Sequence, residues 1–324
     1  MHDKVEAAES AVRSIQRQFG RGSILLLGDD GAVEPIAAIS TGSLGLDAAT
    51  GVGGCPRGRV IELFGPKGSG KTTLGLHAVA SAQTAGGIAA FIDAGHSLDI
   101  RYAAGIGVSV DRLYLSQPDT GEQAFEIVEI LCRSGGVDLV VVDSVNALTP
   151  RAEIEGEAGD EYTGLRARLM SQALRKLTAA VHRTGTCLVF LTETMSVAPV
   201  GCSNALKFYA SVRIEARRLR EEQDGDRVVG GLVRVRVVKN KVARPFGEAE
   251  FTIRPGIGID RVAELADRAV ALGALAGSAD VPFAATRDAG KLAAVLRESG
   301  DLQASLERTV RERLGLTRLP SSST

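Results

Sequence analysis

The stretch that decides the fold runs from position 60 to position 73 and reads Val60-Ile61-Glu62-Leu63-Phe64-Gly65-Pro66-Lys67-Gly68-Ser69-Gly70-Lys71-Thr72-Thr73. Its first five residues are mostly apolar and predict a short buried strand. Residues 65–72 match the pattern GxxxxGK[ST], and a helix is predicted to begin near Thr72. A glycine-rich turn between a strand and a helix N-terminus is typical of a phosphate-binding loop, and a chance turn is the weaker alternative.

The chemistry of this loop predicts a nucleotide with Mg²⁺ as its ligand. Glycines let successive backbone N–H groups turn toward phosphate oxygens, and the helix N-terminus adds partial positive charge. Lys71 can reach the terminal phosphates, and the Thr72 hydroxyl can ligate Mg²⁺. A second group on the metal side is expected to be an acid at the end of a buried strand. Asp143 ends the apolar run 139–142; an ordinary strand-end aspartate is the alternative for this residue taken alone.

Apolar runs along the chain predict an α/β fold with a mostly parallel central sheet. Such runs, each followed by a turn and a segment of helical period, occur at 60–64, 89–92, 113–115, 139–142 and 188–191. This alternation is typical of strands buried between crossover helices. After Ala210 the period changes to two, in 212–216 and 232–238, around a polar, glycine-containing connection at 224–226. Period two predicts antiparallel strands, so the sheet is expected to be mixed.

Four segments are predicted along the chain. Apolar residues recur at helical spacing in 3–19, so 1–32 is expected to be a short helix and linker that packs on its own core or on a neighbouring subunit. Residues 33–259 form the core. Residues 260–316 form a small α/β C-terminal domain with helical segments near 260–275 and 288–314, and 317–324 form a flexible tail.

Composition excludes several classes of protein. The 324 residues are 44% hydrophobic and 24% charged, which is typical of a globular chain and not of a disordered one. A net charge of −1 excludes a polycation that binds nucleic acid by charge alone, although residues 217–246 hold nine basic residues against four acidic ones. The four cysteines form no CxxC pair, which gives no sign of a disulfide framework or zinc site. No apolar stretch is long enough for a membrane span or a signal peptide, so we expect a cytoplasmic protein.

Six segments resemble the bacterial RecA recombinase family. They are ISTGSL at 39–44, GPKGSGKTT at 65–73, SQPDTGEQA at 116–124, VVDS at 141–144, AEIEGE at 152–157 and NALKFYASVR at 204–213. The similarity runs from about residue 15 to about residue 251 and is weaker over 287–314. It implies a RecA-type P-loop ATPase core that binds ATP and Mg²⁺ between adjacent subunits of a helical filament. The filament would coat single-stranded DNA, pair it with homologous double-stranded DNA, and trigger the DNA-damage (SOS) response by stimulating self-cleavage of a repressor.

The resemblance, applied position by position, assigns further site residues. Asp99 and Tyr102 would flank the adenine, and Ser144 would follow the metal-side acid. Lys239 and Lys241 would reach the γ-phosphate bound by the neighbouring subunit. Two lysines at i and i+2 on an edge-like strand share a face, where their charges repel unless an anion lies between them. A solvated strand face is the alternative.

The resemblance also assigns DNA contacts. A first DNA-binding loop would span 157–164, and Arg168, Ser171 and Arg175 on the helix after it would touch phosphates. Asn204 would lie at the end of a second DNA-binding loop. The spacing of the first three residues places them on one helix face. A solvated helix surface is the alternative for that face.

The chain departs from the family at three places. The family's water-activating glutamate is Gly95 here, with His96 or Asp93 as conceivable substitutes, so hydrolysis is expected to be slow. The family's γ-phosphate-sensing glutamine is Glu193, whose carboxylate a triphosphate would repel. The loop 194–203 is shorter than the family's second DNA-binding loop.

Two functions remain open from the sequence. One is an active recombinase, and the other is a divergent ATP-binding paralogue that regulates or joins a filament without hydrolysing ATP. A second recombinase or a repressor would be further partners. A ring-forming motor of the same ATPase fold is a third alternative, which the long RecA-like segments disfavour.

Overall fold

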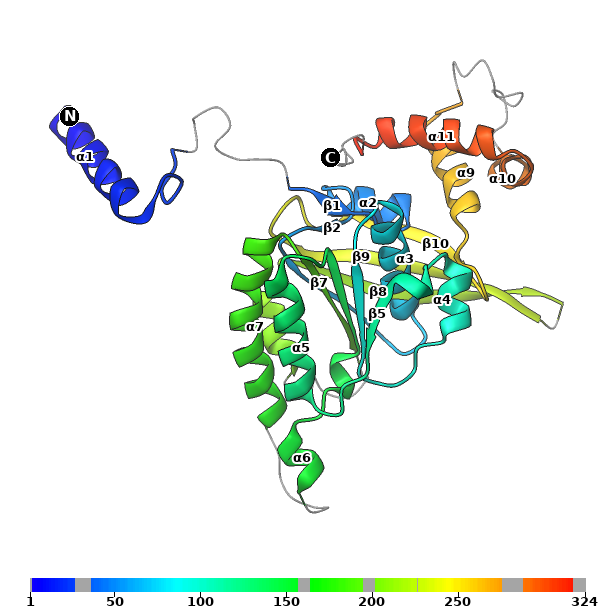
Figure 1. Ribbon diagram of the computed structural model, residues 1–324. Coiled ribbons are helices and arrows are strands. Elements are labelled where there is room, and N and C mark those ends of the chain that lie inside the picture. The colour runs from blue at the N-terminus through cyan, green and yellow to red at the C-terminus, as the bar shows by residue number, and fades with distance from the viewer. Residues whose placement is uncertain are drawn as a thin grey trace. The chain divides into compact units, whose positions relative to one another are not determined.

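The structure is a computed structural model that describes residues 2–26, 36–156, 164–194, 202–225, 227–275 and 288–316. The expected tail at 317–324 and most of the two expected DNA-binding loops lie outside these residues. The chain divides into two compact units, residues 1–36 and 37–324, which we describe separately (Figure 1).

The N-terminal unit contains one helix, α1 (His2–Phe19), in its described part. The helical spacing of the apolar residues in 3–19 predicted it, and the helix is confirmed. It ends before Gly20, which has a positive φ of 94° that few other residues adopt. Val5 and Phe19 of its apolar side are exposed.

The second unit is organised by a nine-stranded mixed sheet with the order β11-β10-β9-β8-β3-β7-β6-β4-β5. The predicted parallel strands are β3 (Val60–Gly65), β4 (Ala89–Asp93), β5 (Leu113–Ser116), β6 (Leu139–Asp143) and β7 (Cys187–Glu193). The antiparallel part consists of β8 (Val212–Asp224), β9 (Arg227–Asn240), β10 (Glu248–Arg254) and β11 (Gly258–Ile259). β8 joins the two parts by pairing parallel to β3 and antiparallel to β9. A separate pair is formed by β1 (Ala38–Ile39) and β2 (Cys55–Pro56).

Helices cover both faces of the parallel strands because successive strand residues point to opposite faces. α3 (Lys71–Thr84) and α4 (Ile100–Ile106) pack on one face, where Phe91 and Val141 belong to their core. α5 (Gly121–Ser134), α7 (Leu165–Thr184) and α8 (Cys202–Tyr209) pack on the other, whose core includes Phe190. α5 and α7 lie side by side (Figure 1). The shorter helices are α2 (Leu44–Thr50) and α6 (Arg151–Glu155).

The carboxyl ends of four parallel strands meet at one edge of the sheet. Gly65 at the end of β3 lies opposite Glu193 at the end of β7, and Asp93 of β4 lies opposite Asp143 of β6. Ligands of open α/β sheets bind outside this edge. The register therefore gathers the loop after β3 and three acidic residues in one place.

The described residues after 260 form three helices, α9 (Arg261–Ala271), α10 (Ala289–Glu298) and α11 (Gly300–Arg313). The predicted segment 288–314 is two helices, because the Ser299 hydroxyl accepts a hydrogen bond from the Leu302 N–H and starts a new one. Buried Leu265, Leu292 and Leu306 belong to their common core. Glu264 of α9 accepts hydrogen bonds from the Ser43 hydroxyl (2.6 Å) and the Gly45 N–H (2.8 Å), which join these helices to the start of α2.

Among the helices that the structure describes, none has the length and apolarity needed to cross a membrane.

Candidate functional site

The loop after β3 adopts a backbone that its glycines make possible. Gly68 and Gly70 have positive φ values of 74° and 88°. A Cβ on Gly70 would come within 2.4 Å of the Ile253 Cδ1 atom, so the position tolerates no side chain without rearrangement. α3 begins at Lys71, directly after this turn. Its N-terminal N–H groups therefore lie at the carboxyl edge of the sheet, as the motif predicted.

Lys71 folds over the loop that it follows. Its Nζ donates to the carbonyl oxygens of Gly65 (3.0 Å) and Pro66 (2.7 Å). Burial lowers the pKa of Lys71, while the nearby carboxylates of Glu193 and Asp143 act in the opposite direction. The Ser69 hydroxyl in the same loop is buried without a hydrogen-bond partner among the described residues. A buried donor without a partner at the start of a helix fits a bound phosphate oxygen.

Thr72 and Asp143 form the pair that the sequence assigned to Mg²⁺. The Thr72 Oγ1 donates to Asp143 Oδ2 at 2.6 Å, although 71 positions separate the residues. Burial raises the pKa of the Asp143 carboxyl, the hydrogen bond from Thr72 opposes this, and the carboxylates of Asp93 and Glu193 reinforce it. A half-buried hydroxyl and carboxylate beside the phosphate loop are oxygen donors of the kind that Mg²⁺ prefers, so these residues fit the ion. Ser144 follows directly at the end of β6.

A cleft of about 780 Å³ continues from the loop toward α4. Asp99 and Tyr102, which the resemblance places beside the adenine, both line it. Asp99 caps α4 by accepting from the N–H groups of Arg101 (2.8 Å) and Tyr102 (3.1 Å). The Tyr102 hydroxyl lies 2.7 Å from the Thr73 hydroxyl, which fixes the ring beside the loop. Burial raises the pKa of Tyr102, so it stays a neutral phenol.

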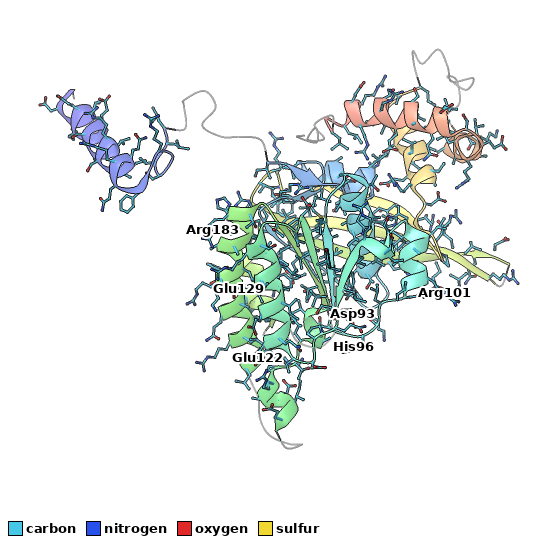
Figure 2. The ribbon with its side chains drawn as sticks, in the orientation of Figure 1. Asp93, His96, Arg101, Glu122, Glu129 and Arg183 are labelled. Carbon is cyan, nitrogen blue, oxygen red and sulfur yellow. The ribbon has the colours of Figure 1, made fainter. Side chains whose placement is uncertain are left out.

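The rest of the cleft lining consists of residues that the sequence did not assign to the nucleotide site. They are Arg101, Arg218, Val228, Gly230, Gly231, Ile253, Arg254, Pro255 and Gly256. Arg218 was counted in the basic excess of 217–246, and the adjacent glycines in the interior of β9 carried a signal too, because glycine within a strand often marks a close approach of backbone or ligand. Arg101 lies at the start of α4 (Figure 2).

The turn after β4 contains Gly95, where the resemblance placed a water-activating glutamate. Gly95 is exposed, and a Cβ there would meet only the Ser97 Oγ at 3.5 Å and the Ala147 Cβ at 4.0 Å. His96 is exposed and has a positive φ of 51°. Asp93 is fully buried and accepts hydrogen bonds from the N–H groups of Ser97 and Leu98 and from the Gln117 side chain. Asp93 therefore holds the turn, and Figure 2 shows it and His96 at the same end of the sheet.

Glu193 lies at the end of β7, between the loop and Asp143. Its N–H donates to Asn146 Oδ1 (2.7 Å) and its carbonyl accepts from Asn146 Nδ2 (3.0 Å). The next residue, Thr194, donates its N–H to the Gly65 carbonyl (3.0 Å), the oxygen that Lys71 also contacts. The Glu193 carboxylate is half-buried and accepts no hydrogen bond from the described residues.

Lys239 and Lys241 lie away from the cleft, at the other end of β9. β9 pairs with β8 and β10, but its pairing with β10 stops at Arg236, so the strand is edge-like at Lys239, as expected, and Lys241 lies just after its end. Lys239 Nζ donates to the carbonyls of Lys207 (2.6 Å) and Phe208 (3.1 Å), and Lys241 Nζ approaches the latter at 3.5 Å. The C-terminal carbonyls of α8 therefore hold both ammonium groups side by side. Burial lowers the pKa of Lys239, and the charges of Lys241 and Arg213 lower it further.

The DNA-contact candidates lie on two helices in contact, α7 and α8. Arg168 and Arg175 of α7 are exposed and make no hydrogen bond or ion pair with any described residue, and Ser171 between them is half-buried. Met170, Leu174 and Leu177 occupy the buried side of the helix. Asn204 is exposed on α8. Residues 157–163 and 195–201, in the expected DNA-binding loops, lie outside the described residues.

Comparison with known proteins gives one consistent result. The model of the RecA N-terminal domain family matches residues 6–260. Protein RecA 1 of Myxococcus xanthus is 54% identical over 332 residues, which cover 99% of this chain and 96% of the relative. Protein RecA of Frankia casuarinae is 51% identical, with 98% and 95% covered, and Protein RecA of Campylobacter hominis is 48% identical, with 99% and 96% covered.

Proposed function

Because the chain belongs to the RecA family, we propose that it is a recombinase switched mainly by ATP binding, with slow hydrolysis. Membership gives the chain a RecA-like recombination and repair function, with nucleotide binding, DNA binding and filament formation. The named relatives give no support to the alternative of a regulator. A protein that recombines DNA works where the chromosome lies, so the proposal includes a cytoplasmic location.

The observation that carries the nucleotide part is the Thr72–Asp143 hydrogen bond beside a phosphate loop whose lysine is held in place. In the proposal, loop N–H groups and Lys71 bind the phosphates, Thr72 and Asp143 hold Mg²⁺, and Asp99 and Tyr102 contact the nucleoside. Mg²⁺ would supply charge neutralisation at the phosphates. The chain's own groups position the triphosphate.

DNA binding and assembly are assigned to separate surfaces. The free guanidinium groups of Arg168 and Arg175, with Ser171 and Asn204, would hold the sugar-phosphate backbone of single-stranded DNA. Lys239 and Lys241 would contact the triphosphate of the next subunit, which would link filament assembly to ATP. Double-stranded DNA, a second recombinase and a repressor are further proposed partners.

Slow hydrolysis follows from Gly95, which has no group to orient or deprotonate water. Loss of general-base assistance typically costs on the order of 10²–10⁴ in rate. ATP binding does not depend on that group, so an ATP-bound, DNA-coating state would persist.

The test is binding of a labelled single-stranded oligonucleotide, followed by fluorescence anisotropy with Mg²⁺ and a non-hydrolysable ATP analogue. We expect tight binding with the analogue and weak binding without nucleotide, with filaments visible by electron microscopy. Absence of binding in the presence of the analogue would contradict the recombinase assignment.

A further inference from the structure

We propose that the Glu193 carboxylate accepts the proton of the water that attacks the γ-phosphate of ATP, in place of the side chain that Gly95 lacks. The inference rests on the proposed function and names the group through which the remaining hydrolysis runs. In this step the water oxygen forms a bond to the γ-phosphorus, and the bond from that phosphorus to the bridging oxygen breaks. ADP leaves with the electron pair, and the water proton passes to Glu193.

The position of Glu193 in the sheet is the first observation that supports this role. Glu193 lies opposite Gly65 in the register of β3 and β7, one residue before the N–H that bonds the Gly65 carbonyl. Lys71 Nζ contacts that same carbonyl at 3.0 Å. Lys71, which is expected to touch the terminal phosphates, and the strand end that carries Glu193 are therefore both bonded to the Gly65 carbonyl. The carboxylate also acts electrostatically on both Lys71 and Asp143, which places it on the phosphate side of the strand.

The carboxylate of Glu193 is also available to accept a proton. Three carboxylates lie at the ends of β4, β6 and β7. Asp93 is occupied by three donors and Asp143 by Thr72. Glu193 alone of these three accepts no hydrogen bond from the described residues, and it is half-buried.

The backbone of Glu193 is held in place on both sides. Asn146 binds both the N–H and the carbonyl of Glu193, and β3 binds the residue that follows it. A base on a fixed backbone keeps its reach to the reacting atoms, whereas one on a free loop does not. His96 lies on an exposed turn, where its ring has no partner among the described residues.

The experiment uses Glu193→Gln, which keeps the shape of the side chain and removes the base. We expect DNA-stimulated turnover to fall on the order of 100-fold, since general-base assistance is removed. Affinity for a non-hydrolysable ATP analogue with Mg²⁺, measured by calorimetry, should rise about tenfold, because a negative charge near the γ-phosphate is lost. Affinity for ADP should not change. Glu126→Gln, an exposed glutamate on α5, is the matched control.

The Gly95→Glu variant, used as a second background, distinguishes loss of the base from damage to the fold. In Gly95→Glu the base is restored elsewhere, so adding Glu193→Gln should leave turnover within about threefold. If Glu193 only repels the triphosphate, Glu193→Gln in the wild-type background would raise turnover, which overturns the proposal. Unchanged turnover, or no hydrolysis by the wild type above the level of Lys71→Ala, also overturns it. If the wild type does not bind Mg²⁺–ATP at all, the proposed function itself is refuted.

Discussion

Lys71 is the residue whose charge the nucleotide site uses most directly. Its ammonium is held by two loop carbonyls, which bound phosphate oxygens can replace. Charge-assisted hydrogen bonds contribute about 1.5–3 kcal/mol each, so Lys71→Ala should weaken Mg²⁺–ATP binding by ~100-fold or more. Titration calorimetry measures it, with the exposed Lys291→Ala as the control. Unchanged affinity in Lys71→Ala would remove the phosphate-loop assignment.

Gly95 stands where the resemblance to the family places a water-activating glutamate. The turn has space for a side chain, since a Cβ would make only ordinary contacts and the backbone is not left-handed. Gly95→Glu should therefore raise DNA-stimulated turnover by up to ~100-fold, because Glu193 already supplies part of the roughly 10²–10⁴ that general-base assistance is worth. Gly95→Gln has the same size without the base and should not. Equal stimulation by both variants, or a fast wild type, would contradict the expectation.

At the scale of elements, α7 carries the prediction for DNA. Arg168→Ala with Arg175→Ala should weaken binding of a single-stranded oligonucleotide in the presence of an ATP analogue. If each guanidinium releases counterions from one phosphate, the slope of log affinity against log salt should become shallower by about 1.4. Anisotropy at several salt concentrations measures both quantities.

The control for this prediction lies on the same helix. Arg183 is exposed and lies at the end of α7 away from α6 (Figure 2). Arg183→Ala should leave both affinity and slope unchanged. A double variant with the wild-type salt slope would show that the two arginines do not contact phosphate.

The elements were predictable where the pattern is local. Each apolar run from 60–64 to 188–191 is a strand, and the glycine-rich loop lies between β3 and α3. Charge was less predictable, because it depends on partners across strands. The basic excess counted in 217–246 is reduced in the fold, since Arg234 and Arg236 pair with Glu250 and Glu248 of β10, outside the counted stretch.

The residues that line the rest of the cleft could not be assigned from the sequence for the same reason. Arg218, Gly230 and Arg254 come from three strands that reach the phosphate loop only through the register of the antiparallel part. The catalytic significance of Glu193 depends on Asn146, which is 47 positions away. Neither relation leaves a periodicity or a motif.

At the scale of the whole molecule, His77 links α3 to β11. The ring is buried, and its Nε2 accepts the Ile259 N–H at 2.8 Å. Burial, with a smaller effect of Arg261, lowers the pKa of His77 to about 4. A histidine whose pKa is lowered by folding stabilises the fold above its unfolded pKa of about 6.5. This stability is lost as the pH falls from about 6.5 to about 4.

Urea denaturation at pH 7.5 and pH 5 checks this expectation. The free energy of unfolding of the wild type should fall by up to ~2 kcal/mol more than that of His77→Gln, which cannot be protonated. His182→Gln, at an exposed histidine, should follow the wild type. Equal pH dependence of the wild type and His77→Gln would show that His77 does not titrate on unfolding.

β9 has a mechanical consequence for the filament. One part of the strand, at Gly231, lines the nucleotide cleft of its own subunit, and Lys239 lies eight positions further along. At about 3.3 Å per residue, these points are roughly 26 Å apart. Hydrogen bonds to β8 along this length, and to β10 as far as Arg236, keep the strand from stretching. If Lys239 contacts the neighbour's triphosphate, the length of β9 sets the spacing of successive ATP molecules, and with it the helical pitch imposed on the DNA.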